Sequence, residues 1–211
     1  MTASQFTPAN GPLFGTQTSD WEAFYEAELQ EHLEVARRTH QELYQSFYDL
    51  TQCCLNSIRN GGKILFFGNG GSAADAQHLA TELTVRYKAN RPPIAALALT
   101  TDTSALTAIA NDFSFEDLFA RQIQALGNPG DVALGITTSG KSPNVTKAFL
   151  TAKQLGLKTC ALSGRDGGDL VGKVDHLLIV PSHTTSRIQE MHIMLGQMLC
   201  GSLEKALGLV D

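Results

Sequence analysis

A glycine-rich turn at residues 68–72 follows a short apolar run and precedes an alanine-rich stretch. The apolar run predicts a buried strand, the glycines predict a tight turn, and the alanines predict a helix. A helix N-terminus exposes free backbone N–H groups and a positive partial charge, so it favours an anion such as phosphate. His78 and Glu82 follow four residues apart, which places them on one face of that helix. The segment thus combines an anion-binding turn with an acid–base pair, a metal-binding pair or a solvated helix face.

Short apolar runs alternate with helical stretches along the chain, which predicts an α/β fold. We expect strands at residues 63–67, 94–99, 132–136, 158–162 and 176–180. We expect helices near residues 73–87, 103–109, 115–126, 143–155 and 167–172, and a long last helix over 184–207. Near-continuous apolar strands separated by helices are typical of a parallel sheet covered on both faces, a three-layer sandwich. Ligands of such sheets bind beyond the carboxyl ends of the strands.

The first part of the chain contains two further predicted helices. From Asp20 onward apolar residues recur at helical spacing, and a second amphipathic pattern runs over residues 40–59. We expect these helices to form a helical hairpin before the sheet. Residues 1–19 are rich in Thr, Ser, Gly, Pro and Asn without an apolar period, which predicts a flexible tail. Residues 20–211 then form one domain with room for a substantial core.

The charge and composition argue against several classes of protein. The formal net charge is −5 and the sequence has no basic run, so it lacks the positive surface that nucleic-acid binding requires. The clearest apolar segment near mid-chain, residues 94–99, is too short to cross a bilayer, and the N-terminus lacks the pattern of a secretory signal. The cysteines show no CxxC spacing and predict reduced, core-filling thiols at Cys53, Cys54, Cys160 and Cys200. We expect a cytoplasmic protein that binds neither nucleic acid nor membrane.

Residues 137–144 form a second polar loop after a predicted strand. Residues 137–142 include four hydroxyl side chains, Lys141 adds a positive charge, and Pro143 suits the first turn of a helix. Hydroxyls and free backbone N–H groups form a phosphate-binding nest, and a Ser- and Thr-rich helix cap is the alternative. The similar turn at residues 68–72 favours phosphate binding. That turn ends in neither GKS nor GKT and lacks the GxGxxG spacing, which argues against ATP and NAD.

Polar residues elsewhere are further candidates. Asp102 follows the second strand as a helix cap or a ligand, and Asn111 with Asp112 forms a plain turn or part of a strand-end loop in the site. In the last helix, Gln189 and Glu190 form a polar edge beside an apolar stripe. Such a stripe is typical of core packing or of a contact between subunits.

Taken together, these motifs resemble the sugar isomerase (SIS) domain and, within it, the phosphoheptose isomerases, over about residues 20–208. The motifs that carry the resemblance lie at residues 68–82, 100–112, 137–144, 164–168 and 187–192. The resemblance implies a sheet flanked by helices and the isomerisation of sedoheptulose 7-phosphate to D-glycero-D-manno-heptose 7-phosphate, a step toward the heptose of lipopolysaccharide. It also implies a homotetramer whose N-terminal helices build a helical core and whose active sites are shared between subunits.

The resemblance also implies roles for individual residues. Sugar-phosphate contacts fall on Asn69, Gly70, Gly71, Ser72, Glu82, Asn111, Asp112, Thr137, Thr138, Ser139, Ser142 and Gln189. Zinc ligands fall on His78, Glu82 and Gln189, and Gln197 occupies the position of the last zinc-binding histidine. An amide oxygen can ligate a metal, but an amide carries no proton at neutral pH. Residues 189 and 197 also lie about 12 Å apart along an ideal helix.

The leading hypothesis is aldose–ketose isomerisation, with Glu82 as the base that removes the proton next to the carbonyl. Gln189, together with Gln197 or His192, would position the oxygens or relay a proton, and a zinc ion would polarise the carbonyl. A second hypothesis is a non-catalytic SIS protein that binds the bacterial replication initiator, and a third is a sensor of sugar phosphates. The two phosphate-binding loops favour the enzyme, because a pure scaffold has little need for either.

Overall fold

The structure is a computed structural model that describes residues 18–210. Its elements are α1 (Thr18–Glu42), α2 (Tyr44–Arg59), β1 (Ile64–Gly68), α3 (Gly71–Thr84), β2 (Ala96–Ala98), α4 (Thr103–Asp112), η1 (Phe115–Asp117), α5 (Leu118–Leu126), β3 (Val132–Ile136), α6 (Pro143–Gln154), β4 (Lys158–Gly164), η2 (Gly168–Leu170), β5 (His176–Val180) and α7 (Thr185–Ala206). The predicted tail lies outside the described residues, apart from Thr18 and Ser19, which already belong to α1. The predicted alternation of strands and helices is confirmed, except that the helix predicted near 167–172 is only the 3₁₀ turn η2.

The strands form a parallel sheet in the order β2-β1-β3-β4-β5. Every residue of β1 and β3 is buried, as expected for strands covered on both faces. The register places Gly68 at the end of β1 opposite Ile136 at the end of β3. The turn that follows β1 and the loop that follows β3 therefore begin side by side, at the carboxyl edge of the sheet.

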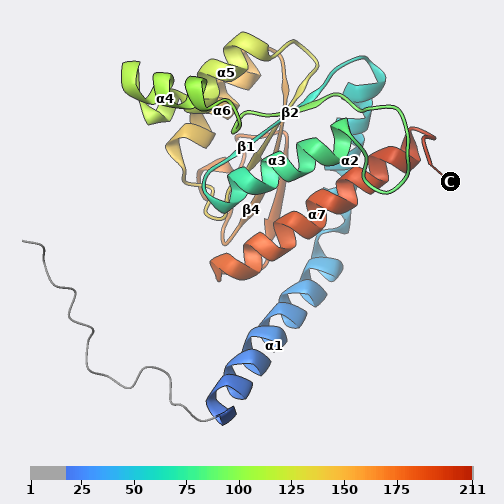
Figure 1. The fold of residues 1–211 in the computed structure, drawn as a ribbon, viewed down its shortest axis with the longest axis vertical. Helices are drawn as coiled ribbons and strands as arrows, with labels where there is room; N and C mark the ends of the chain where they lie inside the picture. The colour runs from blue at the N-terminus through green and yellow to red at the C-terminus, as the bar shows by residue number, and fades with distance from the viewer. Residues whose placement is uncertain (1–17, 211) are drawn as a thin grey trace, which may run out of the picture.

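Helices cover both faces of the sheet, which confirms the three-layer sandwich (Figure 1). Side chains alternate between the faces along each strand. Ile64 and Phe66 of β1 join the core with α2, α3 and α7. Leu65 and Phe67 point to the opposite face and join the core with α4, α5 and α6. Each such fully buried side chain contributes about 1.5–3 kcal/mol through removal of apolar surface from water.

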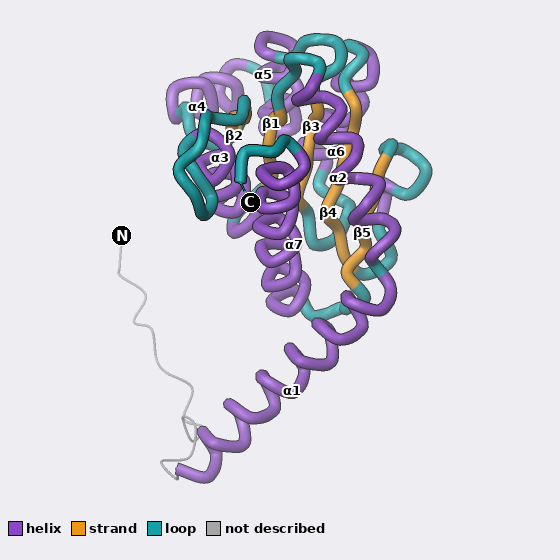
Figure 2. Tube along the Cα trace, turned by 90° about the vertical axis from the view of Figure 1, so that its right-hand side faces the viewer, coloured by secondary structure: helices purple, strands orange, loops and turns teal. Residues whose placement is uncertain are grey.

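The two N-terminal helices are confirmed, but they do not fold back on each other as a hairpin does (Figure 2). Leu43 is the single residue between α1 and α2, and its N–H still donates to the carbonyl of Thr39. The N–H of Phe47 in turn donates to the carbonyl of Leu43. Helical hydrogen bonds thus continue across the junction, and the two helices form one bent run because no loop separates them. The first part of α1 projects away from the sheet (Figures 1 and 2).

Several boundaries differ from the predicted ones. Strand β2 has only three residues rather than the predicted six, and the predicted helix at 115–126 starts as the 3₁₀ turn η1. Asn111 and Asp112 lie in the last turn of α4 rather than in a strand-end loop. The four cysteines are free, and all but the half-buried Cys53 are buried. Among residues 18–210, no helix combines the length and apolar character that crossing a membrane requires.

Candidate functional site

The turn after β1 approaches the end of β3 so closely that glycine is required. A Cβ atom on Gly68 would lie 2.6 Å from the carbonyl oxygen of Ile136 and 2.8 Å from the Cβ of Ser72. Gly70 has a φ of +59°, in the left-handed region that favours glycine. The turn then enters α3 at Gly71, with Ser72 buried. The start of α3 therefore lies directly beyond the sheet, as the sequence predicts, and there the N–H groups of Ser72 and Ala73 donate to the carbonyls of Asn69 and Gly70.

Two asparagines link this turn to the loop after β3. The Nδ2 of Asn69 donates to the Oδ1 of Asn144 at 2.8 Å, and the Nδ2 of Asn144 donates back to the Oδ1 of Asn69 at 2.8 Å. Asn144 lies in the first turn of α6 and is buried. The pair therefore fixes the start of α6 against the turn that opens α3, and both helix starts face the same edge of the sheet.

The loop at residues 137–142 holds the predicted hydroxyl side chains at that edge. Thr137 is buried, Thr138 and Ser139 are half-buried, and Ser142 is the N-cap residue of α6. A neighbouring glycine loop supports this segment, since a Cβ atom on Gly140 would lie 2.1 Å from the carbonyl oxygen of Gly167. The structure thus brings residues 69–72 and 137–142 together, as predicted.

A small cavity of about 160 Å³ lies beside the turn, between residues 68–73 and the aromatic residues Phe115 and Phe119. The side chain and backbone of Thr100 close one side of it, and Thr100 is fixed by its Oγ1 donating to the carbonyl of Ala73 at 3.2 Å. This volume is below the roughly 300 Å³ of typical ligand pockets. Leucine and phenylalanine side chains line much of the cavity, so it does not by itself form an anion site.

His78 and Glu82 contact each other on the exposed side of α3. The Nε2 of His78 lies 3.0 Å from the Oε1 of Glu82, and their side chains are 48% and 19% exposed. Asp75 lies one turn earlier, where burial raises the pKa of its carboxyl group and the charge of His78 opposes that rise. Glu82 is therefore a partly buried carboxylate held by an imidazole, an arrangement that suits a base.

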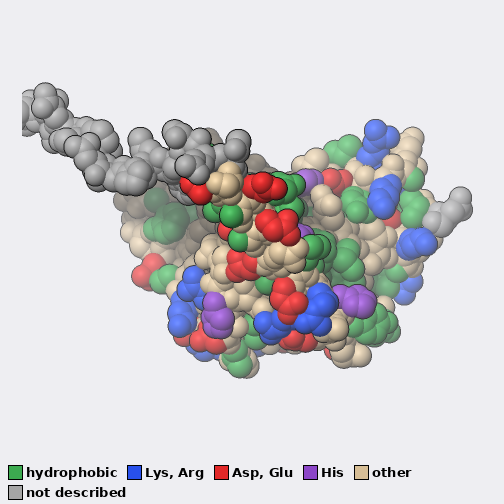
Figure 3. Space-filling view, turned by 90° about the horizontal axis from the view of Figure 1, so that it is seen from below, with side chains coloured by type: hydrophobic (Ala, Val, Ile, Leu, Met, Phe, Trp, Pro, Cys, Tyr) green, Lys and Arg blue, Asp and Glu red, His purple; other side chains and the backbone are tan. Residues whose placement is uncertain are grey.

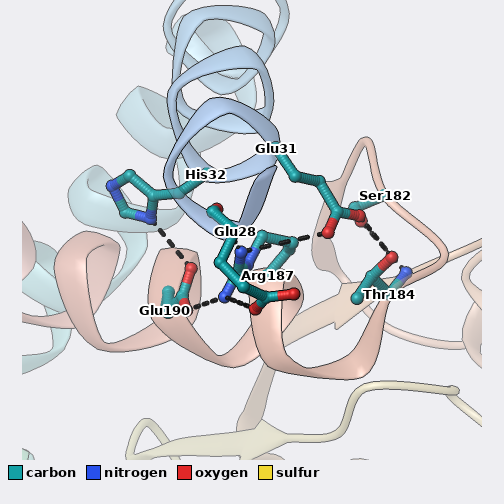
Figure 4. Close-up of polar contacts among 7 residues, drawn as sticks. All are labelled: Glu28, Glu31, His32, Ser182, Thr184, Arg187 and Glu190. Carbon is teal, nitrogen blue, oxygen red and sulfur yellow. Dashed lines mark hydrogen bonds and ion pairs between the residues drawn. The ribbon is translucent and has the colours of Figure 1, made fainter. Parts of the chain in front are cut away.

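Gln189 lies against the start of α3. A Cβ atom on Gly71 would lie 3.0 Å from the Nε2 of Gln189, so the amide of α7 reaches the glycine-rich turn. Next to it, Arg187 and Glu190 tie α7 to α1 (Figure 4). The buried Arg187 forms ion pairs with Glu190 at 2.6 Å and with Glu28 of α1 at 3.1 Å. These ion pairs hold the first turns of α7, which carry Gln189, beside the glycine-rich turn at residues 68–72.

Gln197, the last residue of the candidate metal set, does not line the cavity beside the glycine-rich turn. Gln197 lines a separate cavity of about 650 Å³ between α7 and residues 87–89. His192 is fully buried, and its Nε2 donates to the backbone carbonyl of Ser163 in β4 at 3.0 Å. Burial lowers the pKa of His192 to about 4, and the hydrogen bond to Ser163 opposes this effect. The hypothesis that His192 relays a proton at the site is therefore wrong, because its side chain points into the core.

The donor set for zinc is incomplete within one described chain. His78 and Glu82 are ligand types that zinc prefers, and their close contact suits a shared ion. Among residues 18–210, however, no group of three or more His, Cys, Asp and Glu side chains is placed to hold a metal. The remaining candidates, Gln189 and Gln197, offer only amide oxygens. The residues present do not fit a zinc site in one chain, and no step below depends on a metal.

The last two predicted contacts lie apart from the two loops. Asn111 and Asp112 are exposed at the end of α4, where the Nδ2 of Asn111 donates to the Oδ1 of Asp112 at 2.8 Å. Asp102 is a helix cap, since its carboxylate accepts from the N–H of Ala105 at 3.0 Å. Asn144 was missed as a site residue, although its place just after a Ser-Pro helix start is a signal that points to the loop.

Comparisons with known proteins agree with this geometry. The profile of the SIS domain family matches residues 25–164. The phosphoheptose isomerase of Paramagnetospirillum magneticum is 59% identical over 181 residues, which cover 86% of this chain and 94% of the relative. That of Helicobacter pylori strain P12 is 52% identical over 174 residues, covering 82% and 91%.

Solved structures show the same relationship. The phosphoheptose isomerase GmhA from Neisseria gonorrhoeae has a TM-score of 0.83 at 42% identity, covering 88% of this chain and 99% of that chain. A phosphoheptose isomerase from Francisella tularensis has a TM-score of 0.85 at 34% identity, covering 90% and 100%. The chain therefore belongs to the phosphoheptose isomerase family of SIS-domain proteins and is a sugar-phosphate isomerase.

Proposed function

We propose that this chain interconverts sedoheptulose 7-phosphate and D-glycero-D-manno-heptose 7-phosphate. The observation that carries the proposal is the junction of two polar loops at neighbouring strand ends, joined by Asn69 and Asn144. The helix that opens from the first loop also carries Glu82. The name shared by relatives at 52–59% identity supports the same substrate.

The substrate phosphate would bind where α3 and α6 begin. Both helix starts carry a positive partial charge, and Thr138, Ser139 and Ser142 supply hydroxyls in the loop that enters α6. A seven-carbon sugar would then extend from the phosphate along α3, the helix that carries Glu82. Binding the phosphate far from the reacting carbons orients the substrate, and such orientation contributes several kcal/mol to catalysis.

Glu82 would act as the base. It removes a proton from C1 of the ketose, and the electron pair of that C–H bond forms the C1–C2 double bond of an enediol. The proton then returns to C2 while the proton of O1 moves to O2, so the aldose forms without gain or loss of atoms. His78 holds the carboxylate at 3.0 Å, and Gln189 would hold a substrate oxygen near Gly71, where its amide lies.

Zinc binding stays a proposal that the donor set does not support. His78 and Glu82 would supply two ligands, and Gln189 and Gln197 would have to supply amide oxygens, which are weak zinc ligands. The role that remains for Gln189 in the reaction is a hydrogen bond to a substrate oxygen, whereas Gln197 lines the separate cavity beside residues 87–89. The proton transfer above therefore uses only groups of this chain.

We also propose a homotetramer built through the N-terminal helices, with active sites shared between subunits. Large apolar side chains of α1 are exposed, with Tyr25 at 64% and Leu33 at 57%. Further along, an apolar groove of about 240 Å³ lies between α1, α2 and α7 and includes Phe47, Leu195 and Met198. A second copy would cover both surfaces. Supply of heptose for lipopolysaccharide and a cytoplasmic location remain parts of the proposal.

Proton NMR of the reaction with sedoheptulose 7-phosphate tests the proposal, because the aldose product has a distinct anomeric signal. We expect turnover in the wild type and none in Glu82→Gln, while calorimetry shows that the variant still binds the substrate. Glu42→Gln is the control, since Glu42 forms only an exposed ion pair with Arg38, and it should keep full turnover. Binding without turnover in the wild type would instead support a sugar-phosphate sensor.

Failure to bind any phosphorylated sugar would overturn the proposal and favour the non-catalytic alternative, which a pull-down with the replication initiator would test directly.

A further inference from the structure

A buried ion pair fixes the end of the helix that carries Glu82. Arg91 and Glu204 have side chains only 0% and 2% exposed, and the Nε of Arg91 lies 2.7 Å from the Oε1 of Glu204. Arg91 belongs to the connection between α3 and β2, and Glu204 belongs to the last turns of α7. Neither residue belongs to the loops described above.

Arg91 also donates to the last carbonyls of α3. One terminal nitrogen donates to the carbonyl of Glu82 at 2.7 Å, and the other donates to the carbonyl of Leu83 at 2.7 Å. In a continuing helix those carbonyls would accept from the N–H groups four residues later, but α3 ends at Thr84. The carbonyl of Leu83 also accepts from the N–H of Ile94 at 2.9 Å. The guanidinium thus supplies a donor for the carbonyl of Glu82 and a second donor for that of Leu83, and its positive charge suits a helix C-terminus.

Glu204 accepts a hydrogen bond from the backbone just beyond α3. Its Oε1 accepts from the N–H of Tyr87 at 3.0 Å, the group that would have bonded to the carbonyl of Leu83 had the helix continued. Tyr87 is held on the other side as well, since a Cβ atom on Gly201 of α7 would lie 2.9 Å from its ring. The pair therefore ties α3, the connection at 85–95 and α7 together at one point.

Glu82 lies only two residues before the end of α3. Helix ends fray because their last carbonyls lack partners. A base must stay within a few tenths of an ångström of the carbon acid that it attacks, and small displacements cost large factors in rate. Without an external donor, the backbone of Glu82 would lie in the fraying turn.

We propose that Arg91, held by Glu204, is a positioning residue that fixes the backbone of Glu82 for proton abstraction. This inference rests on the proposed function. It predicts that loss of the pair lowers kcat at unchanged substrate affinity, because the phosphate-binding loops lie at the opposite end of α3. A role in general stability alone would lower neither kcat nor the order of the last turn of α3 in the folded enzyme.

The test replaces both charges by side chains of similar length, Arg91→Met with Glu204→Met, because removal of only one would leave an unpaired buried charge. The control removes a second ion pair at the amino edge of the sheet, Lys63→Met with Asp131→Leu. In that pair the side chains are 26% and 3% exposed. Its hydrogen bonds join residues 63, 128 and 131, none of which belongs to α3 or α7. Both variants are assayed in the full chain, at a temperature where thermal melts show each to be folded.

We expect kcat of the Arg91 and Glu204 variant to fall at least tenfold, while KM for sedoheptulose 7-phosphate changes less than twofold. Hydrogen exchange of the peptide that covers residues 80–88 should become faster in this variant only. The control should keep kcat within twofold of the wild type and leave exchange in α3 unchanged.

Two outcomes would overturn the inference while the proposed function stands: wild-type turnover with unchanged kcat in the variant, or unchanged exchange at the end of α3. Equal losses of kcat in the variant and in the control would also overturn it, because general destabilisation would then explain both. A wild type without turnover would overturn the proposed function and this inference together.

Discussion

Protonation of His192 should destabilise the fold as the pH falls from neutral toward about 4. The side chain is fully buried, and its Nε2 must carry the proton because its partner, the carbonyl of Ser163, only accepts. The Nδ1 of His192 has no hydrogen-bond partner. A second proton would therefore go to Nδ1 and create an unpaired charge in the core, which is the physical reason why burial lowers the pKa to about 4.

The sign of the effect follows from the two pKa values. The unfolded chain binds a proton near pH 6.5 and the folded chain only near pH 4, so between these values the unfolded state holds more protons. Stability is fully present above pH 6.5 and is lost as the pH falls toward 4. The difference corresponds to about 3 kcal/mol, most of which is already lost at pH 4.5.

Urea denaturation between pH 4.5 and 7.5 measures this loss, with His192→Met as the comparison. The methionine fills a similar volume and cannot titrate, so its stability should lack the histidine contribution. Carboxylates with lowered pKa values, such as Asp117 and Asp175, also destabilise the fold in acid, but they do so equally in both proteins. Parallel stability profiles for wild type and variant over this pH range would refute the reasoning.

The remaining predictions concern the site. Gly140→Ala should cost about 2–5 kcal/mol of stability, because the φ of Gly140 is +65° and a Cβ atom there would overlap a carbonyl. Gly61→Ala should cost only about 1 kcal/mol, because Gly61 has a φ of +80° but open space around it. Equal urea midpoints for the two variants would contradict this difference. Asn144→Ala should raise KM about tenfold, since the lost amide pair is worth about 1–3 kcal/mol; an unchanged KM would exclude the link. Gln197→His should increase zinc retained after dialysis, because imidazole binds zinc better than an amide, and equal metal contents would contradict the donor argument.

The sheet and the two polar loops at its carboxyl edge could be predicted because their determinants are local. Strands β1 and β3 are short apolar runs that end at glycine or at hydroxyl residues, and that pattern is set by neighbouring residues alone. Parallel strands then bring the loops together, since loops that follow parallel strands gather at the same edge. Knowledge of the alternation of elements was therefore enough to place residues 69–72 beside 137–142.

Other parts depend on contacts between distant segments and leave no local pattern. The predicted hairpin is wrong because two successive amphipathic patterns do not reveal whether the chain turns back between them, and the backbone continues its helical hydrogen bonds through Leu43. His192 follows Gln189 by three residues and looks equally polar in the sequence. Only the packing of α7 on β4 decides that its ring meets Ser163 in the core.

The acidic character of α1 also acquires a meaning only in three dimensions. Seen from below, acidic side chains gather on this end of the molecule with Lys, Arg and His side chains beside them (Figure 3). Glu28 and Glu31 of α1 surround the buried Arg187, and His32 lies 2.8 Å from Glu190. Most exposed charges contribute little to stability, but these hold the one crossing of α1 over α7.

Different contacts fix Gln189 and Glu82 at opposite ends of α3. In the proposed function, the first end would bind the phosphate and the second would carry the base. At the start, Gly71 lacks a side chain, so the amide of Gln189 can approach the turn. In the middle of α3, Leu79 packs against α7. A Cβ atom on Gly196 of α7 would lie 2.4 Å from the Leu79 side chain, so α3 and α7 can approach this closely because residue 196 is glycine. Arg91 fixes the end at Glu82. In the proposed function, the length of α3 would set the distance between the bound phosphate and Glu82, and a helix holds that length more rigidly than a loop could.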